Sequence, residues 1–392
     1  MTMSAGNSEL PPVQRRLRIA VLNRVFRPTG GGAERYSIAL VEQLAQRHDI
    51  HVFAQEIDHQ WPGVRYHQVP GFLKKPRWIN QLWYAAATWW MTRRGFDVVH
   101  SHENTWHGQV QTVHVLPVKH NLFHGRTGWR LFLRWFKVLT SPRLLAYLWL
   151  ERLRYAPCPG RSVVLTSASL QAIMAQTYPA ARSMLKIVTP GVAEVPGPAD
   201  AQGRVQARLH LGLPGQGRCI LFVGNDFRKK GLITLLEALR HLPDDAWLAV
   251  VGNPAQIAGV QSEVRGRGLT QRVHFLGALD DVGAAYRAAD CLAHPTLEDT
   301  FAMVVLEAMA HGLPVVVSSA RYCGISAMLE DGAQALLLQN PEDAGALAAA
   351  LKRVLDEPVL TVTLSQAGCV FAHEHQWRQA ALEQERIYAS VG

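Results

Sequence analysis

The stretch that most constrains the fold is residues 294–318, HPTLEDTFAMVVLEAMAHGLPVVVS. Its central part predicts a helix, because Val304, Glu307 and His311 recur at three- and four-residue spacing and therefore share one face. A glycine and a proline end that helix, and the valines at 315–317 follow. A short run of β-branched residues is typical of a parallel strand that is buried on both faces. The stretch therefore predicts a loop, a helix and a buried strand in succession, as in α/β folds.

The loop that opens this helix has the residues of a binding site. Thr296 or Asp299 is expected to cap the helix, and the backbone N–H groups that follow attract phosphate. About two turns further on, the carboxylate of Glu307 can accept hydrogen bonds from sugar hydroxyls. These groups together suit a nucleotide sugar. An ordinary helix–strand unit with a solvated glutamate fits the same residues, and both interpretations stay open on this pattern alone.

Apolar runs that predict buried strands alternate with helical segments along the chain. In the first half they lie at residues 17–26, 51–54, 96–100, 110–115 and 163–167. In the second half they lie at residues 219–224, 246–252, 273–277, 291–294 and 315–317. This order predicts an α/β protein of two doubly wound, Rossmann-like domains that face each other across a cleft. Pro and Gly concentrate at residues 193–204, which we interpret as the linker.

Composition narrows the class of protein. The 392 residues are 48% hydrophobic and 18% charged, which fits a globular protein with large cores. The five cysteines are scattered and match no disulfide or metal spacing, as expected in a reducing compartment. Residues 1–14 are polar, and no run of about 18 apolar residues occurs. We therefore expect a cytoplasmic protein with a disordered lead-in at 1–14, a first domain at 15–195 and a second at 205–375.

The net charge of +9 belongs mainly to the first half of the chain. No Asp or Glu occurs between Asp58 and Asp97, nor between Glu103 and Glu151, whereas Lys and Arg are frequent in both gaps. A surface with this excess of positive charge attracts anionic membrane lipid, a phosphorylated acceptor or nucleic acid.

Residues 129–154 begin inside the second of these gaps and predict two helices that separate at Pro142. Arg130, Arg134 and Lys137 form a basic stripe, and aromatic and leucine side chains occupy another face of the same helix. That pattern is typical of an amphipathic helix in a membrane interface, although a buried helical lid with solvated arginines fits the same sequence. A second aromatic cluster precedes it, at Trp78, Trp83, Tyr84, Trp89 and Trp90.

Two further loops follow predicted strands and suit phosphate. Gly31 and Gly32, with Gly30, precede a helix predicted at 33–47, and they permit close approach of a ligand to the backbone. No Gly-x-Gly-x-x-Gly fingerprint is present, and a turn without a ligand is the alternative. The loop at residues 225–231, NDFRKKG, contains Lys229 and Lys230 at the carboxyl end of a strand, where cations can bind a diphosphate. A solvated run of charge is the alternative there.

Histidines gather after the strands of the first half, but they predict no metal. His102, His107, His114 and His120 are separated by five, seven and six residues, which matches no zinc pattern. His114 lies near a strand end and is a candidate for lining the cleft. A buried histidine with satisfied hydrogen bonds is the alternative.

These segments resemble the retaining GT-B glycosyltransferases of family 4, or group 1, which include the lipopolysaccharide core glucosyltransferases. The family pattern is an acidic residue, seven others, and then a Glu followed by Ala-Met-Ala-x-Gly-x-Pro-Val. Glu307 and residues 308–315 match this pattern at every position. The first acid is either Asp299, which is in register, or Glu298, displaced by one. Residues 300–302 replace the usual Gly-Phe-Gly.

The resemblance implies a role for each of these groups. Glu307 would bind the donor ribose, Asp299 or Glu298 would face the sugar hydroxyls, and His114 would lie close to the transferred sugar. The two lysines and the amides of residues 301–303 would neutralise the leaving diphosphate. The expected catalytic residues are His114, Asp299, Glu307 and Lys230. The expected donor-binding residues are Gly31, Gly32, Asn225 (where an arginine is frequent in the family), Lys229, Lys230, Glu298, Asp299, Thr300, Phe301, Ala302, Met303 and Glu307.

The resemblance further implies a retaining glycosyltransferase that uses a nucleoside diphosphate sugar as substrate, with no metal or other cofactor. The first domain would bind the acceptor, the second the donor, and a last helix at 376–392 would return to the first domain. The basic, aromatic first domain predicts a lipid-linked or lipopolysaccharide-type acceptor, and a protein that is peripheral on the cytoplasmic face of the inner membrane. We expect neither nucleic acid nor an obligate protein partner. A GT-B epimerase or phosphorylase, or a non-enzymatic basic binding protein, are the alternatives.

Overall fold

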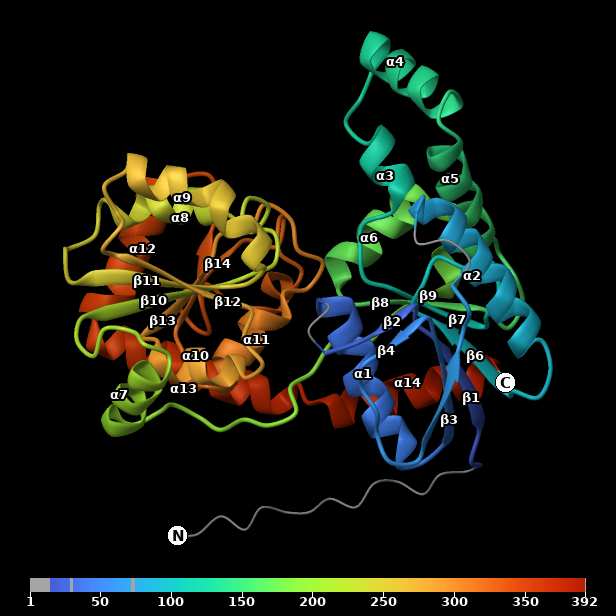
Figure 1. The fold of residues 1–392 in the computed structure, drawn as a ribbon, viewed down its shortest axis with the longest axis horizontal. Helices are drawn as coiled ribbons and strands as arrows, with labels where there is room; N and C mark the ends of the chain where they lie inside the picture. The colour runs from blue at the N-terminus through green and yellow to red at the C-terminus, as the bar shows by residue number, and fades with distance from the viewer. Residues whose placement is uncertain (1–14, 29–30, 72–74, 392) are drawn as a thin grey trace.

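The computed structural model describes residues 15–28, 31–71 and 75–391, so that Gly30 of the glycine loop lies outside the described residues. The chain forms two α/β domains, drawn mainly in blue and green for the first and in yellow and orange for the second (Figure 1). This confirms the predicted fold class of two doubly wound domains.

A seven-stranded parallel sheet forms the centre of the first domain, in the order β5-β3-β1-β6-β7-β8-β9. Its strands, in that order, are Val64–Gln68, Asp49–Ala54, Arg18–Leu22, Val98–Ser101, Val110–Val113, Ser162–Leu165 and Leu185–Ile187. The helices of this half are α1 (Gly32–Ala45), α2 (Arg77–Thr92), α3 (Val118–Phe123), α4 (Gly128–Leu139), α5 (Pro142–Arg154) and α6 (Ala168–Thr177).

A six-stranded parallel sheet forms the centre of the second domain, in the order β12-β11-β10-β13-β14-β15. Its strands, in that order, are Val273–Gly277, Ala246–Val251, Arg218–Val223, Cys291–His294, Val315–Ser318 and Leu336–Leu338. The helices that accompany it are α7 (Ala201–His210), α8 (Leu232–Leu239), α9 (Ile257–Gly266), α10 (Val282–Ala288), α11 (Met303–Ala310), α12 (Ala344–Asp356) and α13 (Pro358–Glu374).

The apolar strands are buried on both faces, as their sequences predict. In β10, Phe222 packs into a core that contains Leu235 of α8, whereas its neighbour Leu221 packs into a core that contains Leu306 of α11. Successive side chains of a strand point to opposite faces, so a wholly apolar strand requires helices on both sides. The loop that follows such a strand then opens at the edge of the sheet, where open α/β sheets bind their ligands.

Two local predictions were wrong. The helix after β13 is capped neither by Thr296 nor by Asp299, because it begins at Met303 with Ala302 as the N-cap residue. The single strand predicted at 17–26 is divided: β1 ends at Leu22, and β2 (Val25–Phe26) pairs instead with β4 (Glu56–Ile57) in a separate two-stranded sheet.

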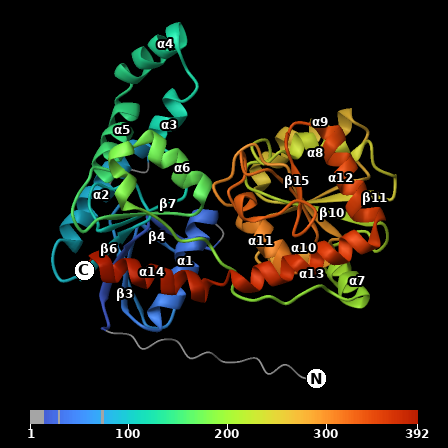
Figure 2. The ribbon, with the colours of Figure 1, turned by 180° about the vertical axis from the view of Figure 1, so that it is seen from behind.

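The last helix, α14 (Trp377–Val391), continues from α13 and runs along the first domain, whereas α13 lies against the second (Figure 2). Trp377, Ala380 and Tyr388 share a buried core with Tyr36 of α1. The hydroxyl of Tyr388 lies 2.7 Å from Nδ1 of the buried His100 in β6. Helix α14 therefore completes the core of the first domain.

Helix α4 lies at the tip of an extension built from α3, α4 and α5, at the top of Figure 1. Pro142 begins α5, as predicted for the break between the two helices. Helix α4 of this extension is not a buried lid, because most of its large apolar side chains are exposed. Those of α4 are Trp129, Phe132, Leu133, Trp135, Phe136 and Leu139. Among the described residues, no helix is long and apolar enough to span a membrane.

Candidate active site

A cavity of about 1630 Å³ separates the two domains and is lined by both of them. Its first-domain side includes the start of α1 and the segment after β7, and its second-domain side includes the loops after β10 and β13. The structure places every predicted site residue on this one cavity. They are Gly31, Gly32, His114, Asn225, Lys229, Lys230, Glu298, Asp299, Thr300, Phe301, Ala302, Met303 and Glu307.

The loop at residues 225–231, called the basic loop below, is held against the segment that follows β13. Gly231 has a φ of 82° and packs so closely that a Cβ atom there would lie 1.9 Å from the carbonyl oxygen of Pro295. Only glycine tolerates both conditions. This approach brings Lys230 to Asp299, with which it forms an ion pair, and Lys229 to Glu298, with which it forms a second one.

Asp299 is the most heavily hydrogen-bonded acid of the site. Its Oδ2 atom binds the ammonium group of Lys230 and lies 3.2 Å from Nε2 of His294. Its Oδ1 atom accepts from the backbone N–H groups of Phe301 and Ala302, at 3.3 and 2.9 Å. Burial acts to raise the pKa of this carboxyl, but the hydrogen bond from His294 and the charge of Lys230 together hold the pKa below its ordinary value. Asp299 is therefore ionised at neutral pH.

These hydrogen bonds change the expectation for the amides of residues 301–303. Two of the three, those of Phe301 and Ala302, already donate to Asp299. The carboxylate of Asp299 therefore accepts hydrogen bonds from two of the donors that we expected to face a diphosphate. Ala302 itself has a φ of 73°, which is the left-handed conformation that side chains other than glycine disfavour. It stands where the family usually has glycine.

Glu307 lies about one turn into α11, on the cavity wall, and is bound from both domains. Its Oε1 atom forms an ion pair with Arg35 of α1, and its Oε2 atom accepts from the hydroxyl of Tyr286 at 2.8 Å. The charge of Glu307 raises the pKa of the Arg35 guanidinium, against the opposing effect of burial. Glu307 is thus a fixed carboxylate, one of whose partners comes from the opposite domain.

Neutral hydrogen bonds join the domains at the same place. The hydroxyl of Thr300 donates to the carbonyl oxygen of His114 at 2.8 Å, and the hydroxyl of Ser167 donates to the carbonyl oxygen of Thr300 at 2.6 Å. The segment after β13 is therefore attached to the ends of β7 and β8. The predicted donor-binding loop and the predicted cleft histidine are in direct contact.

Sequence analysis did not assign a role to Arg35, Tyr286, His294 or His102. His294 is the last residue of β13, and a polar side chain at the carboxyl end of a strand is a usable indication. Arg35 and Tyr286 carry no comparable indication, since they reach Glu307 from 272 and 21 residues away in the chain. The described residues contain no group of three or more His, Cys, Asp or Glu side chains arranged to hold a metal ion.

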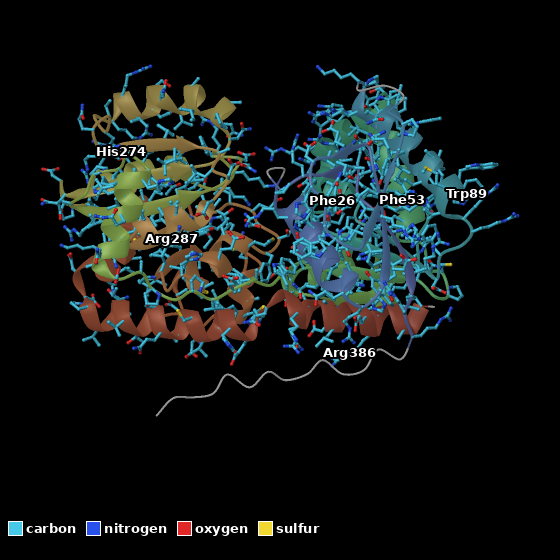
Figure 3. The ribbon with its side chains drawn as sticks, turned by 60° about the horizontal axis from the view of Figure 1, so that its bottom comes forward. Phe26, Phe53, Trp89, His274, Arg287 and Arg386 are labelled. Carbon is cyan, nitrogen blue, oxygen red and sulfur yellow. The ribbon has the colours of Figure 1, made fainter. Side chains whose placement is uncertain are left out.

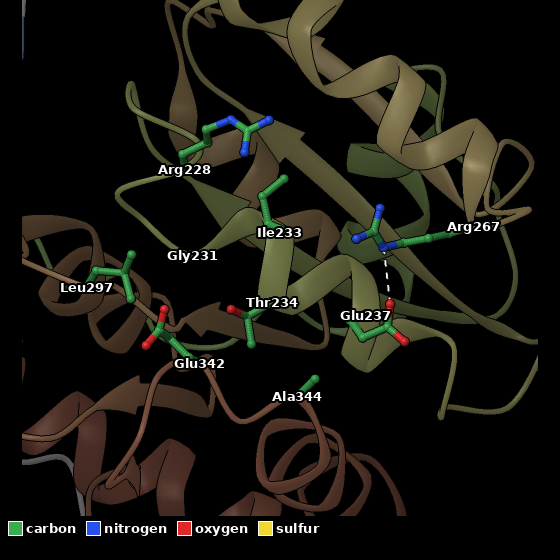
Figure 4. A pocket seen from close by; sticks show the side chains of 9 residues that line it. All are labelled: Arg228, Gly231, Ile233, Thr234, Glu237, Arg267, Leu297, Glu342 and Ala344. Carbon is green, nitrogen blue, oxygen red and sulfur yellow. Dashed lines mark hydrogen bonds and ion pairs between the residues drawn. The ribbon is translucent and has the colours of Figure 1, made fainter.

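A smaller pocket, of about 430 Å³, belongs to the second domain alone (Figure 4). Arg267 contacts Glu237 beside it, and Arg228, Thr234 and Glu342 also line it. None of the predicted site residues lines this pocket. The converging lysines and acids are found at the cavity between the domains.

Comparison with known proteins agrees with this geometry. The model of Glycosyltransferase Family 4 matches residues 30–194, and the model of glycosyl transferases group 1 matches residues 206–371. A phosphatidyl-myo-inositol mannosyltransferase from Mycobacterium leprae is 29% identical over 317 residues, which are 77% of this chain and 75% of that protein. The chain belongs to the group 1 glycosyltransferases of GT-B fold, and it is accordingly a glycosyltransferase.

Solved structures show the same fold. The structure of WaaG, a glycosyltransferase involved in lipopolysaccharide biosynthesis, superimposes with a TM-score of 0.81 at 20% identity, and covers 94% of this chain and 99% of its own. Anabaena HepE in complex with UDP and glucose superimposes with a TM-score of 0.74 at 17% identity, and covers 96% of this chain and all of its own.

Proposed function

We propose that this glycosyltransferase moves a sugar from a nucleoside diphosphate sugar to a lipid-linked or lipopolysaccharide-type acceptor, with retention at the anomeric carbon and without a metal. The observation that carries the proposal is the convergence of two lysines, Asp299 and Glu307 on one cavity between the domains. Cations suit a diphosphate, and fixed carboxylates suit the hydroxyls of ribose and sugar. The HepE complex, which has the same fold, contains UDP and glucose and supports this choice of donor.

Departure of the nucleoside diphosphate develops negative charge, and stabilising that charge is the main catalytic requirement. Lys230 meets this requirement best, because Asp299 and the carbonyl oxygen of Glu298 hold its ammonium group in place beside the cavity before any ligand arrives. A preorganised cation stabilises a transition state without reorganisation. We expect turnover to be unchanged in the presence of EDTA, and loss of turnover that is restored by added Mg²⁺ would contradict the metal-independent mechanism.

Asp299, rather than Glu298, is the acid that we assign to the sugar hydroxyls. Its side chain is 16% exposed and is oriented by four hydrogen-bonding groups, whereas that of Glu298 is 37% exposed and pairs with Lys229. Because Lys230 and His294 already bind Asp299, we do not assign it as a nucleophile of a double displacement. The proposed retention is tested by following the anomeric configuration of the first product by NMR, and an inverted product would contradict it.

The proposed acceptor rests on exposed side chains of α4 and α2 in the first domain. On α4 the side chains of Trp129, Phe132 and Phe136 are exposed beside the basic stripe of Arg130, Arg134 and Lys137. Trp89 and Trp90 of α2 are exposed as well, and Trp89 lies at the outer edge of the first domain (Figure 3). Apolar and basic side chains together favour an anionic membrane surface, in this proposal the cytoplasmic face of the inner membrane. The name of the M. leprae relative specifies a phosphatidyl-inositol substrate, which supports a lipid acceptor.

The first experiment is a thermal-shift screen with UDP, GDP, ADP and CMP, each also as common sugar derivatives. A ligand that binds only the folded state raises the midpoint of unfolding by mass action, so the acceptor need not be known. We expect one diphosphate to raise the midpoint clearly, and its sugar derivative to be hydrolysed or transferred slowly. If none of these ligands shifts the midpoint, the assignment of the cavity to a nucleotide sugar is wrong.

A further inference from the structure

His102 and His114 form a hydrogen-bonded pair at the first-domain side of the cavity. His102 follows β6, His114 follows β7, and these strands are neighbours in the sheet. Nδ1 of His102 lies 3.0 Å from Nε2 of His114, and the two ring planes differ by only 10°. His114 lines the cavity, whereas His102 does not, so His102 stands behind it.

Both rings are neutral. Burial lowers the pKa of His114 to about 3, with a further contribution from the charge of Arg154. Burial likewise lowers the pKa of His102 well below its ordinary value, and His100, His114 and Arg154 act in the same direction. No carboxylate offsets these effects in either ring. Two neutral imidazoles in contact share one proton at that contact, so the pair has two possible arrangements.

In the first arrangement, Nδ1–H of His102 donates to Nε2 of His114, and His114 carries its own proton on Nδ1. In the second, Nε2–H of His114 donates to His102, which must then carry its proton on Nε2. Nε2 of His102 is buried and has no hydrogen-bond partner among the described residues. The neighbouring His100 cannot be the hydrogen-bond partner of this atom, because its two ring nitrogens already pair with Tyr388 and Thr112, at 2.7 and 2.6 Å.

The two arrangements therefore differ in what is left unpaired inside the protein. The first leaves a lone pair on His102, and the second leaves a buried N–H group. A buried donor without an acceptor is the rarer and more costly defect. We infer that His102 is a positioning residue that fixes His114 as the Nδ1–H tautomer, so that His114 acts as a hydrogen-bond donor toward the cavity and not as a general base.

This inference deepens the proposed function and rests on it for the identity of the recipient. Nδ1 of His114 makes no hydrogen bond within the part of the chain that the structure describes. An oxygen atom of the bound sugar is the acceptor that suits it, because Nδ1–H of a neutral ring is a hydrogen-bond donor. Thr300 reaches across from the donor-binding loop to the backbone of the same residue, so His114 is fixed at its main chain as well.

The tautomer is measured directly from the ¹⁵N chemical shifts of the His114 ring in the full-length protein, with assignment by the spectrum of a His114→Gln variant. We expect protonated Nδ1 and bare Nε2, and a protonated Nε2 would overturn the inference. This readout requires no donor or acceptor. Absence of turnover with every nucleotide sugar would contradict the proposed function while leaving the tautomer result intact.

Two variants of His102 that are isosteric with each other test the consequence for catalysis. In His102→Asn, the amide N–H takes the place of Nδ1–H, and we expect kcat within about threefold of the unaltered protein, since one hydrogen bond of the same sense is retained. In His102→Asp, a carboxylate takes the same place and draws a proton to Nε2 of His114. We expect kcat to fall about 10- to 100-fold while affinity for the nucleoside diphosphate stays the same, since the proposed partner of His114 is the sugar.

A purely structural role for His102 predicts the same kcat in the Asn and Asp variants. Equal values would therefore overturn the inference. Thermal melts establish that both variants are folded. Should the buried carboxylate prevent folding of His102→Asp, the ring-nitrogen spectra of the unaltered protein and of His102→Asn decide the question alone, because the inference requires the same His114 tautomer in both.

Discussion

Two basic regions of the molecule differ in whether their positive charges are paired with acids. In the basic loop, Lys229 and Lys230 are each paired with an acid, and only 20% of the Lys230 side chain is exposed. On α4, Arg130, Arg134 and Lys137 form no ion pair within the described part of the chain, and exposed aromatic side chains accompany them. The first arrangement fixes each charge at one point, and the second leaves the charges mobile over a surface.

This difference indicates what each region can bind. A cation that is oriented by a carboxylate has already lost the freedom that ligand binding would otherwise remove, which favours a small ligand of defined shape. Unpaired cations on long side chains adjust to many positions of negative charge, which favours a fluid lipid surface. The four predictions below test this contrast, beginning with the largest expected effect.

Replacement of the buried cation should have the largest effect. We expect Lys230→Gln to lower turnover about 100- to 1000-fold and to weaken nucleoside diphosphate binding, because the preorganised charge at the leaving group is lost. The matched variant Lys229→Gln removes a half-exposed partner of Glu298 and should cost less than about tenfold. Steady-state kinetics and titration with the diphosphate measure both. Unchanged affinity in Lys230→Gln would show that the phosphate site lies elsewhere.

The basic stripe should contribute to membrane binding and not to binding of the donor. We expect replacement of Arg130, Arg134 and Lys137 by Gln to reduce co-sedimentation with anionic vesicles about 100-fold, since each cation near such a surface contributes about 1 kcal/mol. The thermal shift with the nucleotide should be unchanged. The control replaces three exposed cations far from α4 in sequence, Arg182, Lys186 and Lys352, and should bind vesicles normally. Equal sedimentation of both triple variants would assign the extension a structural role.

Acid should remove the stabilisation that the paired carboxylate provides. The pKa of Asp299 is lower in the folded than in the unfolded protein, so its stabilisation is present above the unfolded pKa, about 4, and is lost as the pH falls below it. We expect Asp299→Asn to lower the free energy of unfolding by about 2 kcal/mol at neutral pH, with the difference narrowing below about pH 4. Urea unfolding across this range measures it. A difference for Asp299→Asn that stays constant across this pH range would contradict the ion-pair explanation.

The smallest effect is expected at Ala302, where the backbone is left-handed. Ala302→Gly removes the steric cost of that conformation, about 1–2 kcal/mol, but makes the unfolded chain more flexible by about 0.4–1 kcal/mol. We therefore expect a gain of stability of about 1 kcal/mol or less by thermal melting, with the donor site intact. Destabilisation would mean that the methyl group contributes packing that outweighs the strain.

Most of the fold could be predicted from the sequence, because each strand is marked by its own run of apolar residues. The valines at 315–317 and the apolar run at 219–224 lie in parallel strands, as any residues buried on both faces would suggest. Helix α13 was not predicted. Its sequence, PVLTVTLSQAGCVFAHE, is rich in β-branched residues that form helices poorly, and its position depends on packing against α11, where Gly368 lies against Met309.

Some residues of the candidate site could likewise be predicted from the sequence, and others could not. Residues at strand ends and in the loop before α11 could be proposed from their positions, and the structure gathers them on one cavity. The sequence could not decide between Glu298 and Asp299, because neighbouring residues of an irregular loop have no period that tells which one turns inward. Nor could it pair Arg35 with Glu307, since that contact exists only once two separate domains have folded and met.

The first domain cannot be completed when its own strands have been synthesised, because α14, which belongs to its core, follows the second domain in the chain. Tyr388, which is hydrogen-bonded to His100 beneath the cavity, is translated after the whole second domain. A nascent chain that has completed β1 to β9 still lacks the α14 side chains that pack with α1 in the core of that domain. The second domain, whose strands and α7 to α13 are contiguous, can fold while the first still waits for α14. Completion of the first domain therefore depends on prior synthesis of the second, and a chain that stops before α14 lacks that part of the first domain's core.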